Sequence, residues 1–264
     1  MRSKAKISVV IPVYNSEECL EALVNRLDKC LCDVPSEVIF VNDCSPDNSW
    51  QKIKEAAKSD KFIGINLRKN AGQDNAIMAG LSRVTGDYIV IMDDDLQHDP
   101  NDIKKMVQEL ENGNFDVCFA NFMEKKQKLW KNLGSWFNGK MSEIIINKPP
   151  RIYLSPFKVI RREVVDEIVK YQGPYPYVDG LIFTVTHNVT QVYVEHHNRF
   201  SGSGNYTLSR SVAVWLKLMT SFSVFPLRIA TIIGMMASAS GFLLALFFLI
   251  RYFMAGEKVE GWTS

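Results

Sequence analysis

Residues 88–100, YIVIMDDDLQHDP, decide the predicted fold, because an apolar run passes directly into three consecutive aspartates. The apolar run has the length and composition of a strand that is buried on both faces of a parallel sheet. Three adjacent carboxylates repel one another, and their burial is costly unless they are paired or bind a cation. We therefore expect a core strand that ends where its carboxylates have a ligand to hold.

Strands and helices alternate on both sides of this stretch. We expect strands at 6–14, 37–43, 62–67, 87–92 and 115–120, and helices at 16–30, after 45–49, at 71–84 and at 98–110. Ser45 with Pro46, and Asp99 with Pro100, are expected to cap and begin two of these helices. The alternation predicts an α/β fold with a Rossmann-like, mostly parallel sheet.

Ligands of such sheets bind at the carboxyl ends of the strands. Asn42, Asp43 and the three aspartates at 93–95 all fall at those ends.

Beyond residue 122 the alternation of strands and helices becomes less regular. There we expect an amphipathic helix within 124–146, a short strand at 151–154, helices at 162–170 and 177–188, a strand at 190–197 and a flexible loop at 198–210.

The aspartates themselves predict a metal site. Asp93 and Asp95 are separated by one residue at a strand end, so their side chains can point the same way while Asp94 points elsewhere. Two convergent carboxylates bind a hard cation such as Mg²⁺ or Mn²⁺, and Gln97 can add a neutral oxygen. The alternative is an acidic loop that only caps the next helix. Because Asp99 is already placed for that role, the metal interpretation is favoured.

The end of the chain predicts a membrane anchor. Residues 229–250 contain no charged side chain, and as a helix they would span roughly 33 Å, enough for a hydrocarbon core. A buried core helix is the alternative, but core helices are rarely apolar on every face over this length. Arg199, Arg210, Lys217 and Arg228 precede the span and predict that this side faces the cytoplasm.

These patterns divide the chain into four expected parts. Residues 1–208 form the catalytic domain, 209–227 a juxtamembrane amphipathic helix, 228–252 a transmembrane helix and 253–264 a linker. We expect a second span to follow the linker in the full protein. No apolar segment long enough for a signal peptide precedes the first strand, so we expect the catalytic domain to stay in the cytoplasm.

Composition narrows the class of protein. The net charge of +2, without a block of one sign, argues against a nucleic-acid partner. With 47% hydrophobic and 23% charged residues, the chain is not a disordered polymer. Five cysteines without a C-x-x-C pair or zinc-like spacing predict unpaired thiols in a reducing compartment.

Four motifs in order resemble those of family 2 glycosyltransferases of GT-A fold. They are VVIPVYN, VNDCSPDNS, RKNAGQDNAIMAGLSRVTGDYIVIMDDDLQHDP and the late RFSGSGNY…SFSVFPLR before an apolar span. More narrowly, the chain resembles the polyisoprenyl-phosphate glycosyltransferases, a group that includes dolichyl-phosphate mannose synthase and bactoprenol glucosyltransferase. The resemblance covers nearly the whole chain and implies a nucleotide-sugar donor and a divalent cation.

The resemblance also implies roles by position. Asp93, Asp95 and Gln97 match the metal-binding D-x-D-x-Q pattern, and Arg199 lies in a loop that closes over the diphosphate. Asp43 sits where an acidic residue contacts the base. The full set implied for donor binding is Pro12, Tyr14, Asn15, Glu17, Asn42, Asp43, Asn70, Gly72 and Asp94.

The acceptor side is predicted from chemistry and from the resemblance. A lipid phosphate is already anionic near pH 7, since its second pKa is about 6. It therefore needs cations that hold it in line rather than a strong base. Lys131, Ser135 and Lys158 match family positions with an acceptor-side role, and Asp179 could orient a sugar hydroxyl or act as a base.

The chain also departs from the family pattern. Asn42 replaces the first acidic residue after the second strand, and Gln73 stands where many relatives carry a basic or other polar residue. Ser155 and Pro156 supply no carboxylate before Phe157, and G-S-G-N-Y lacks a lysine. His98 is expected either to contact the diphosphate or to be solvated.

Three functions follow from these observations. We favour an inverting transferase that moves a sugar from a UDP- or GDP-linked donor to undecaprenyl-type phosphate at the cytoplasmic face of the inner membrane. The second is a membrane-anchored transferase that elongates a cell-surface glycan on a hydroxyl acceptor, with Asp179 as the base it needs. The third is a catalytically silent nucleotide-binding subunit of a membrane assembly. A homo-oligomer is left open.

Overall fold

The computed structural model describes residues 5–122, 148–150, 152–173, 175–194 and 225–255. The chain divides into two compact units, Met1–Thr207 and Leu208–Ser264. The first unit contains the sheet, and the second contains the long helix α9. Each is described by itself.

The described part of the first unit is built on a seven-stranded sheet of order β3-β2-β1-β4-β6-β5-β7. All neighbouring strands are parallel except β6, which is antiparallel to both β4 and β5. The mostly parallel sheet predicted from the sequence is confirmed. The strands are β1 (Ile7–Val13), β2 (Ser36–Asn42), β3 (Phe62–Asn66), β4 (Tyr88–Ile91), β5 (Val117–Phe122), β6 (Lys158–Arg161) and β7 (Val189–Val194).

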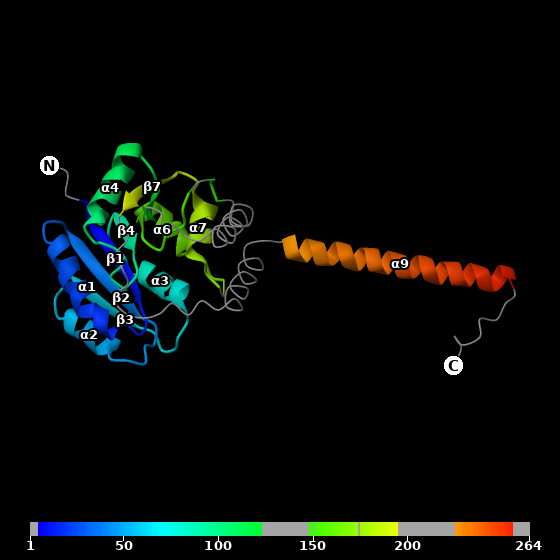
Figure 1. Cartoon of the computed structure of the whole chain (residues 1–264), viewed down its shortest axis with the longest axis horizontal. Coiled ribbons are helices and arrows are strands. Elements are labelled where there is room, and N and C mark those ends of the chain that lie inside the picture. The colour runs from blue at the N-terminus through cyan, green and yellow to red at the C-terminus, as the bar shows by residue number, and fades with distance from the viewer. Residues whose placement is uncertain (1–4, 123–147, 151, 174, 195–224, 256–264) are drawn as a thin grey trace, which may run out of the picture. The chain divides into compact units, whose positions relative to one another are not determined.

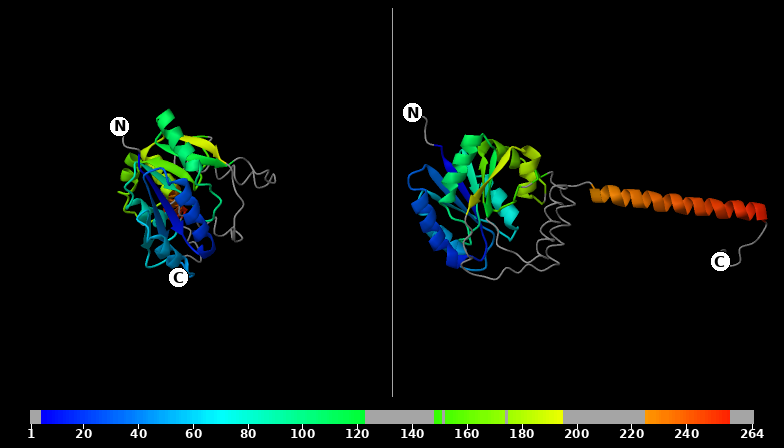
Figure 2. Two further views of the ribbon diagram at one scale, coloured as in Figure 1. Left: turned by 90° about the vertical axis from the view of Figure 1, so that its left-hand side faces the viewer. Right: turned by 45° about the horizontal axis from the view of Figure 1, so that its top comes forward.

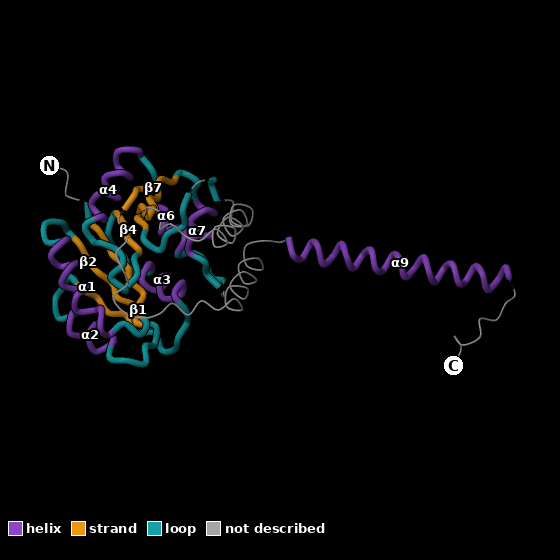
Figure 3. The backbone as a smooth tube through the Cα atoms, viewed as in Figure 1, coloured by secondary structure: helices purple, strands orange, loops and turns teal. Residues whose placement is uncertain are grey.

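Helices cover both faces of this sheet (Figures 1 and 3). Successive side chains of the central strands point to opposite faces of the sheet, and apolar residues are buried on both faces. The helices of the first unit are α1 (Glu17–Cys30), α2 (Ser49–Ala56), α3 (Gln73–Leu81), α4 (Asp102–Gly113), α6 (Arg162–Ile168) and α7 (Val178–Val185). Figure 2 shows the same layers from two further directions.

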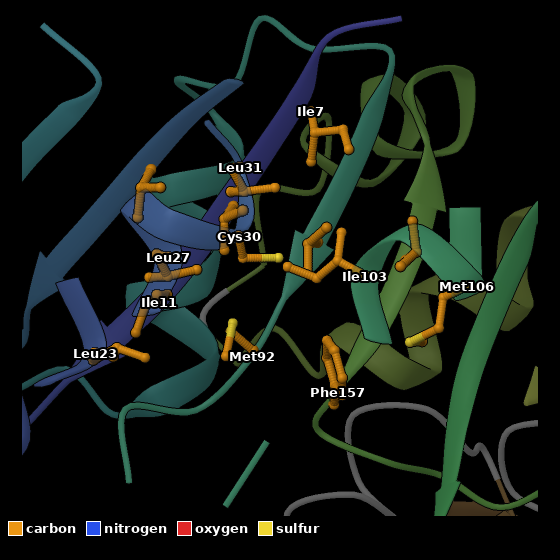
Figure 4. Close-up of a cluster of buried hydrophobic side chains, with 14 of the residues drawn as sticks. Ile7, Ile11, Leu23, Leu27, Cys30, Leu31, Met92, Ile103, Met106 and Phe157 are labelled. Carbon is orange, nitrogen blue, oxygen red and sulfur yellow. The ribbon is translucent and has the colours of Figure 1, made fainter. Parts of the chain in front are cut away.

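One hydrophobic core lies between the sheet and helices α1, α2 and α4 (Figure 4). It includes Leu23 and Leu27 of α1, Met106 of α4 and Ile11 of β1, and each of these side chains is fully buried. The opposite face packs on α3, α6 and α7. Gly80 of α3 lies so close to β1 that an added Cβ would come within 2.4 Å of Val10 Cγ1.

Several local expectations were wrong. The expected strand at 151–154 is absent from the described residues 152–154, and the strand in this part of the chain is β6, which starts at Lys158. Helix α2 begins at Ser49 with Asn48 as its N-cap, so Ser45 caps no helix. Helix α4 begins at Asp102, and Asp99 instead accepts hydrogen bonds from Asn101 N and Nδ2 at 2.9 Å in the preceding turn.

The described part of the second unit is the single helix α9 (Phe225–Ala255). Residues Ala230–Met254 have a mean hydropathy of 2.2 and are long and apolar enough to cross a membrane. The described side chains of this helix are exposed. A soluble unit would bury such a surface, because contiguous apolar area in water is costly.

Candidate active site

The loops at the carboxyl ends of β1, β2 and β4 are tied to one another by hydrogen bonds. Tyr14 N donates to Asp94 Oδ2 at 3.3 Å, which joins the loops after β1 and β4. Asn15 N donates to Ser45 Oγ at 3.2 Å, which joins the loops after β1 and β2. Ser45 therefore has a position between loops rather than at a helix end.

Each of these loops contains a residue with left-handed backbone. Asn15, Cys44 and Leu96 have φ values of 57°, 55° and 62°, in the loops after β1, β2 and β4 respectively. This conformation costs an ordinary L-residue roughly 1–2 kcal/mol, and Leu96 is an unusual occupant. Backbone strain of this kind concentrates at ligand sites, where the surrounding structure holds it in place.

The aspartates after β4 form a tight turn. Gln97 N donates to Asp95 Oδ1 at 3.1 Å and closes the turn. Gln73, the first residue of α3, donates from Nε2 to Asp93 Oδ1 at 2.8 Å. The middle carboxylate, Asp94, instead contacts the loop after β1. Burial raises the pKa of Asp94 to about 6, although hydrogen bonds from Ser16 and Tyr14 act to lower it.

His98 holds the start of the acidic turn through a hydrogen bond with Asp93. Its side chain is 3% exposed and is stacked between the rings of Phe122 and Phe157, at 5.6 and 5.1 Å between centroids. Its Nδ1 accepts a hydrogen bond from Asp93 N at 3.2 Å, so that nitrogen carries no proton. The expectation that His98 is solvated was wrong, because two phenylalanines distant in sequence enclose it.

Asp43 holds the start of α3. Its Oδ1 accepts from Ala71 N at 2.7 Å and its Oδ2 from Gly72 N at 2.9 Å. Asn70 Nδ2 donates to the Asp43 carbonyl at 3.3 Å. Gly72 has φ +89°, which favours glycine at this position. Asp43 is 4% exposed, so its carboxylate shapes the wall of the site through the backbone.

A second charged cluster lies at the same edge. Lys158 begins the antiparallel strand β6 and pairs in register with Ile91 of β4, two residues before Asp93. Its Nζ forms an ion pair with Asp179 of α7 and lies 5.6 Å from the centroid of the Phe119 ring. The two charged side chains are 5% and 14% exposed.

Asp74 connects this cluster to α3. Its Oδ1 accepts from Val178 N, at the start of α7, at 3.2 Å. Burial raises the pKa of Asp74, the nearby Asp179 raises it further, and Lys158 lowers it. Burial also raises the pKa of Tyr177, with the same two carboxylates adding to the effect. Sequence patterns contained no signal for Asp74, and they marked Gln73 only as a departure from the family pattern.

The residues predicted for donor binding come to one edge of the sheet. Pro12 is buried in β1, while Tyr14 and Asn15 are exposed in the loop that follows. Glu17 accepts from Asn48 N and Nδ2. Asn42 donates to Asn66 Oδ1 at 2.7 Å. Lys131, Ser135 and Arg199 lie outside the described residues.

The carboxylates of the acidic turn fit a cation whose coordination is completed by the substrate. No group of three or more His, Cys, Asp or Glu side chains that could hold a metal ion is found in the described ranges. Asp93 and Asp95 supply two carboxylates from one turn. Mg²⁺-type ions commonly take one or two carboxylates and complete their shell with phosphate oxygens and water. The residues present fit that mode and not an all-protein cage.

The mostly parallel sheet and the acidic turn at its carboxyl edge define an α/β protein whose candidate site suits a phosphate ligand with a bound cation. The sequence profile of glycosyl transferase family 2 matches residues 8–169, from β1 through α6. The chain belongs to glycosyl transferase family 2, and it is a glycosyltransferase. The family membership expected from the motifs is confirmed.

Named relatives match over almost the entire chain. An undecaprenyl-phosphate 4-deoxy-4-formamido-L-arabinose transferase of Yersinia enterocolitica is 30% identical over 260 residues, which cover 97% of this chain and 79% of that protein. The enzyme of the same name from Pectobacterium atrosepticum is 32% identical over 256 residues, which cover 95% of this chain and 78% of that protein.

A solved structure supports the fold. Glucosyl-3-phosphoglycerate synthase from Mycobacterium tuberculosis, in complex with Mn²⁺ and uridine-diphosphate-glucose, superposes with a TM-score of 0.60. The match covers 83% of this chain and 79% of that chain at 16% identity. This likeness confirms the expected GT-A fold.

Proposed function

We propose that this glycosyltransferase moves a sugar from a nucleotide-diphosphate-sugar to a polyprenyl phosphate of the undecaprenyl type. The observation that carries the proposal is the match to undecaprenyl-phosphate sugar transferases over 97% of the chain, apolar C-terminal region included. The exposed apolar helix α9 supports this acceptor, because it would hold the enzyme at the membrane in which a polyprenyl phosphate lies. The product would belong to cell-envelope polysaccharide biosynthesis.

We assign cation binding to Asp93 and Asp95, with Gln97 as a third oxygen donor. When bound, Mg²⁺ or Mn²⁺ would neutralise the negative charge that grows on the departing nucleotide diphosphate. The protein's own part is to hold the two carboxylates in a fixed turn. The bonds from Gln73 to Asp93 and from Gln97 N to Asp95 support that assignment.

We assign donor binding to the loops at the same edge. Tyr14, 52% exposed, offers an aromatic face to a UDP- or GDP-linked donor. Asp43 acts there by holding the backbone of residues 71 and 72. The complete proposed set is Pro12, Tyr14, Asn15, Glu17, Asn42, Asp43, Asn70, Gly72 and Asp94.

The acceptor chemistry needs orientation more than a base. A phosphate monoester is anionic near neutral pH, so direct displacement at the anomeric carbon with inversion would leave a β-linked lipid-phosphate sugar. Lys158 and Lys131 are proposed to contribute positive charge near that acceptor, with Ser135 as a neutral polar partner. Arg199 is proposed to lie in the loop that closes over the diphosphate of the donor. Asp179 is held in an ion pair with Lys158, so its carboxylate is not placed to act as a base on a hydroxyl acceptor.

The proposal also includes the position of the chain in the membrane. We propose that residues 228–252 anchor the protein in the cytoplasmic (inner) membrane, with the catalytic domain 1–208 facing the cytoplasm. The juxtamembrane helix 209–227 and the linker 253–264 complete the division. Positive charges before residue 228, Arg210 and Lys217 among them, support this orientation.

The test is radiolabel transfer from a panel of UDP- and GDP-sugars to polyprenyl phosphate, with Mn²⁺ or with EDTA. The expected result is a metal-dependent, mild-acid-labile lipid product that is lost in Asp95→Asn. Asp60→Asn, which changes an exposed carboxylate before β3, is the matched control and should retain activity. Metal-dependent donor hydrolysis without lipid labelling would refute the proposed acceptor and favour glycan elongation.

A further inference from the structure

Gln73 connects helix α3 to the acidic turn at residues 93–95 through a side-chain hydrogen bond. Its Nε2 lies 2.8 Å from Asp93 Oδ1, and only the amino group of the amide can donate to a carboxylate, so the orientation of the side chain is defined. Gln73 is exposed, so this hydrogen bond is not a by-product of core packing. Its position therefore calls for a functional reason.

The backbone on both sides of Gln73 is anchored. Before it, Ala71 N and Gly72 N donate to the two carboxylate oxygens of Asp43. After it, Asp74 Oδ1 accepts from Val178 N at the start of α7. A side chain between two fixed points loses less conformational freedom when it forms a hydrogen bond, so it can hold its partner in one place.

The chemical type of the donor also matters. A lysine or arginine at this distance would hold Asp93 but would place a positive charge beside the position of a bound cation. Like charges at such a distance disfavour one another. The glutamine amide is neutral, so it orients the carboxylate without cancelling the charge that attracts the metal ion.

We infer that Gln73 is a positioning residue that presents Asp93 to the divalent cation, and that its neutrality sets the affinity of the site for that cation. The inference rests on the proposed function, because it assigns the cation to Asp93 and Asp95. Partners that orient a metal ligand typically change metal affinity about 10- to 100-fold when they are removed. Gln73 touches the carboxylate and is not itself assigned as a ligand.

The experiment measures Mn²⁺ binding directly, in the full chain in detergent with UDP present, from the electron paramagnetic resonance signal of free Mn²⁺. Gln73→Met keeps the side-chain length and removes the donor, and Gln73→Lys keeps a donor and adds a charge. Both should raise the Kd for Mn²⁺ about 10-fold. Gln51→Met changes an exposed glutamine of α2 that donates to Glu55, and it should leave the Kd unchanged.

Kinetics separate positioning from a general structural role. In Gln73→Met the Mn²⁺ concentration for half-maximal transfer should rise about 10-fold, while kcat at saturating Mn²⁺ stays near that of the unchanged protein. An unchanged Kd in Gln73→Met would overturn the inference, and an unchanged Kd in Gln73→Lys would overturn the argument from neutrality. If the unchanged protein binds Mn²⁺ in the presence of UDP but labels no lipid, the proposal of a polyprenyl-phosphate acceptor is refuted. The Mn²⁺ Kd values of the Gln73 variants would still decide the role of Gln73.

Discussion

The buried ion pair between Lys158 and Asp179 gives the sharpest stability prediction. Lys158→Met preserves length and bulk, so it creates little cavity, but it leaves Asp179 without its cation in a site where the two side chains are 5% and 14% exposed. Removing one partner of a buried pair costs about 3–5 kcal/mol. Loss of the cation above the Phe119 ring adds up to about 1 kcal/mol.

The cost should depend on pH in a defined direction. Burial already raises the pKa of Asp74, and Lys158 lowers it, so the variant should raise it further. A carboxyl whose folded pKa exceeds its unfolded value of about 3.9 destabilises the protein above that range and is relieved as it takes up a proton. The deficit of Lys158→Met should therefore be largest at pH 7–8 and smaller near pH 5.

Thermal unfolding of the full chain in detergent, followed by tryptophan fluorescence, measures this effect. A loss of about 4 kcal/mol corresponds to a Tm decrease of roughly 8–16 °C for a unit of this size. Lys52→Met is the control, because Lys52 pairs with Glu21 at the surface and should contribute less than about 1 kcal/mol. Adding Asp179→Asn to Lys158→Met should restore much of the loss. A Tm decrease no larger than that of Lys52→Met would refute the reasoning.

Three further predictions concern single side chains of the same unit. His98→Phe keeps the stacked ring but removes the hydrogen-bond acceptor for Asp93 N. The rate of sugar transfer should fall about 10-fold, and the free energy of unfolding should fall by about 1–3 kcal/mol. An unchanged transfer rate would contradict this prediction. Gly80→Ala should destabilise by about 1–3 kcal/mol in thermal unfolding, because the new Cβ would meet Val10 at 2.4 Å. Asp94→Asn should be more stable than the unchanged protein at pH 8, because the raised pKa of Asp94 makes its ionised form costly above about pH 6. The difference in stability should vanish near pH 4. A difference that is the same at pH 8 and pH 4 would contradict this prediction.

Much of the fold could be predicted from local sequence patterns. The apolar runs predicted the first four strands within a few residues, because a buried parallel strand needs a continuous apolar segment. Helix starts were less predictable. Ser45 and Asp99 have the side chains of N-caps, yet each bonds to a loop instead, because short polar side chains satisfy turns as readily as helix ends.

The candidate site was only partly predictable, because its supports come from distant segments. The sequence marked the acidic turn, but not that His98 is enclosed by Phe122 and Phe157. It noted Gln73 as a departure and gave no sign of its bond to Asp93. Such contacts depend on the order of the strands in the sheet and on the positions of the helices. The periodicity of apolar residues within one segment does not specify either.

The sequence by itself determined the alternation of strands and helices, the acidic turn at a strand end and the apolar helix near the C-terminus. Each of these follows from the period, length or polarity of one continuous segment. Only the tertiary structure decided that β6 enters the sheet antiparallel between β4 and β5. That insertion carries Lys158 to the carboxyl edge beside Asp179, because an antiparallel strand presents its first residue where its parallel neighbours end.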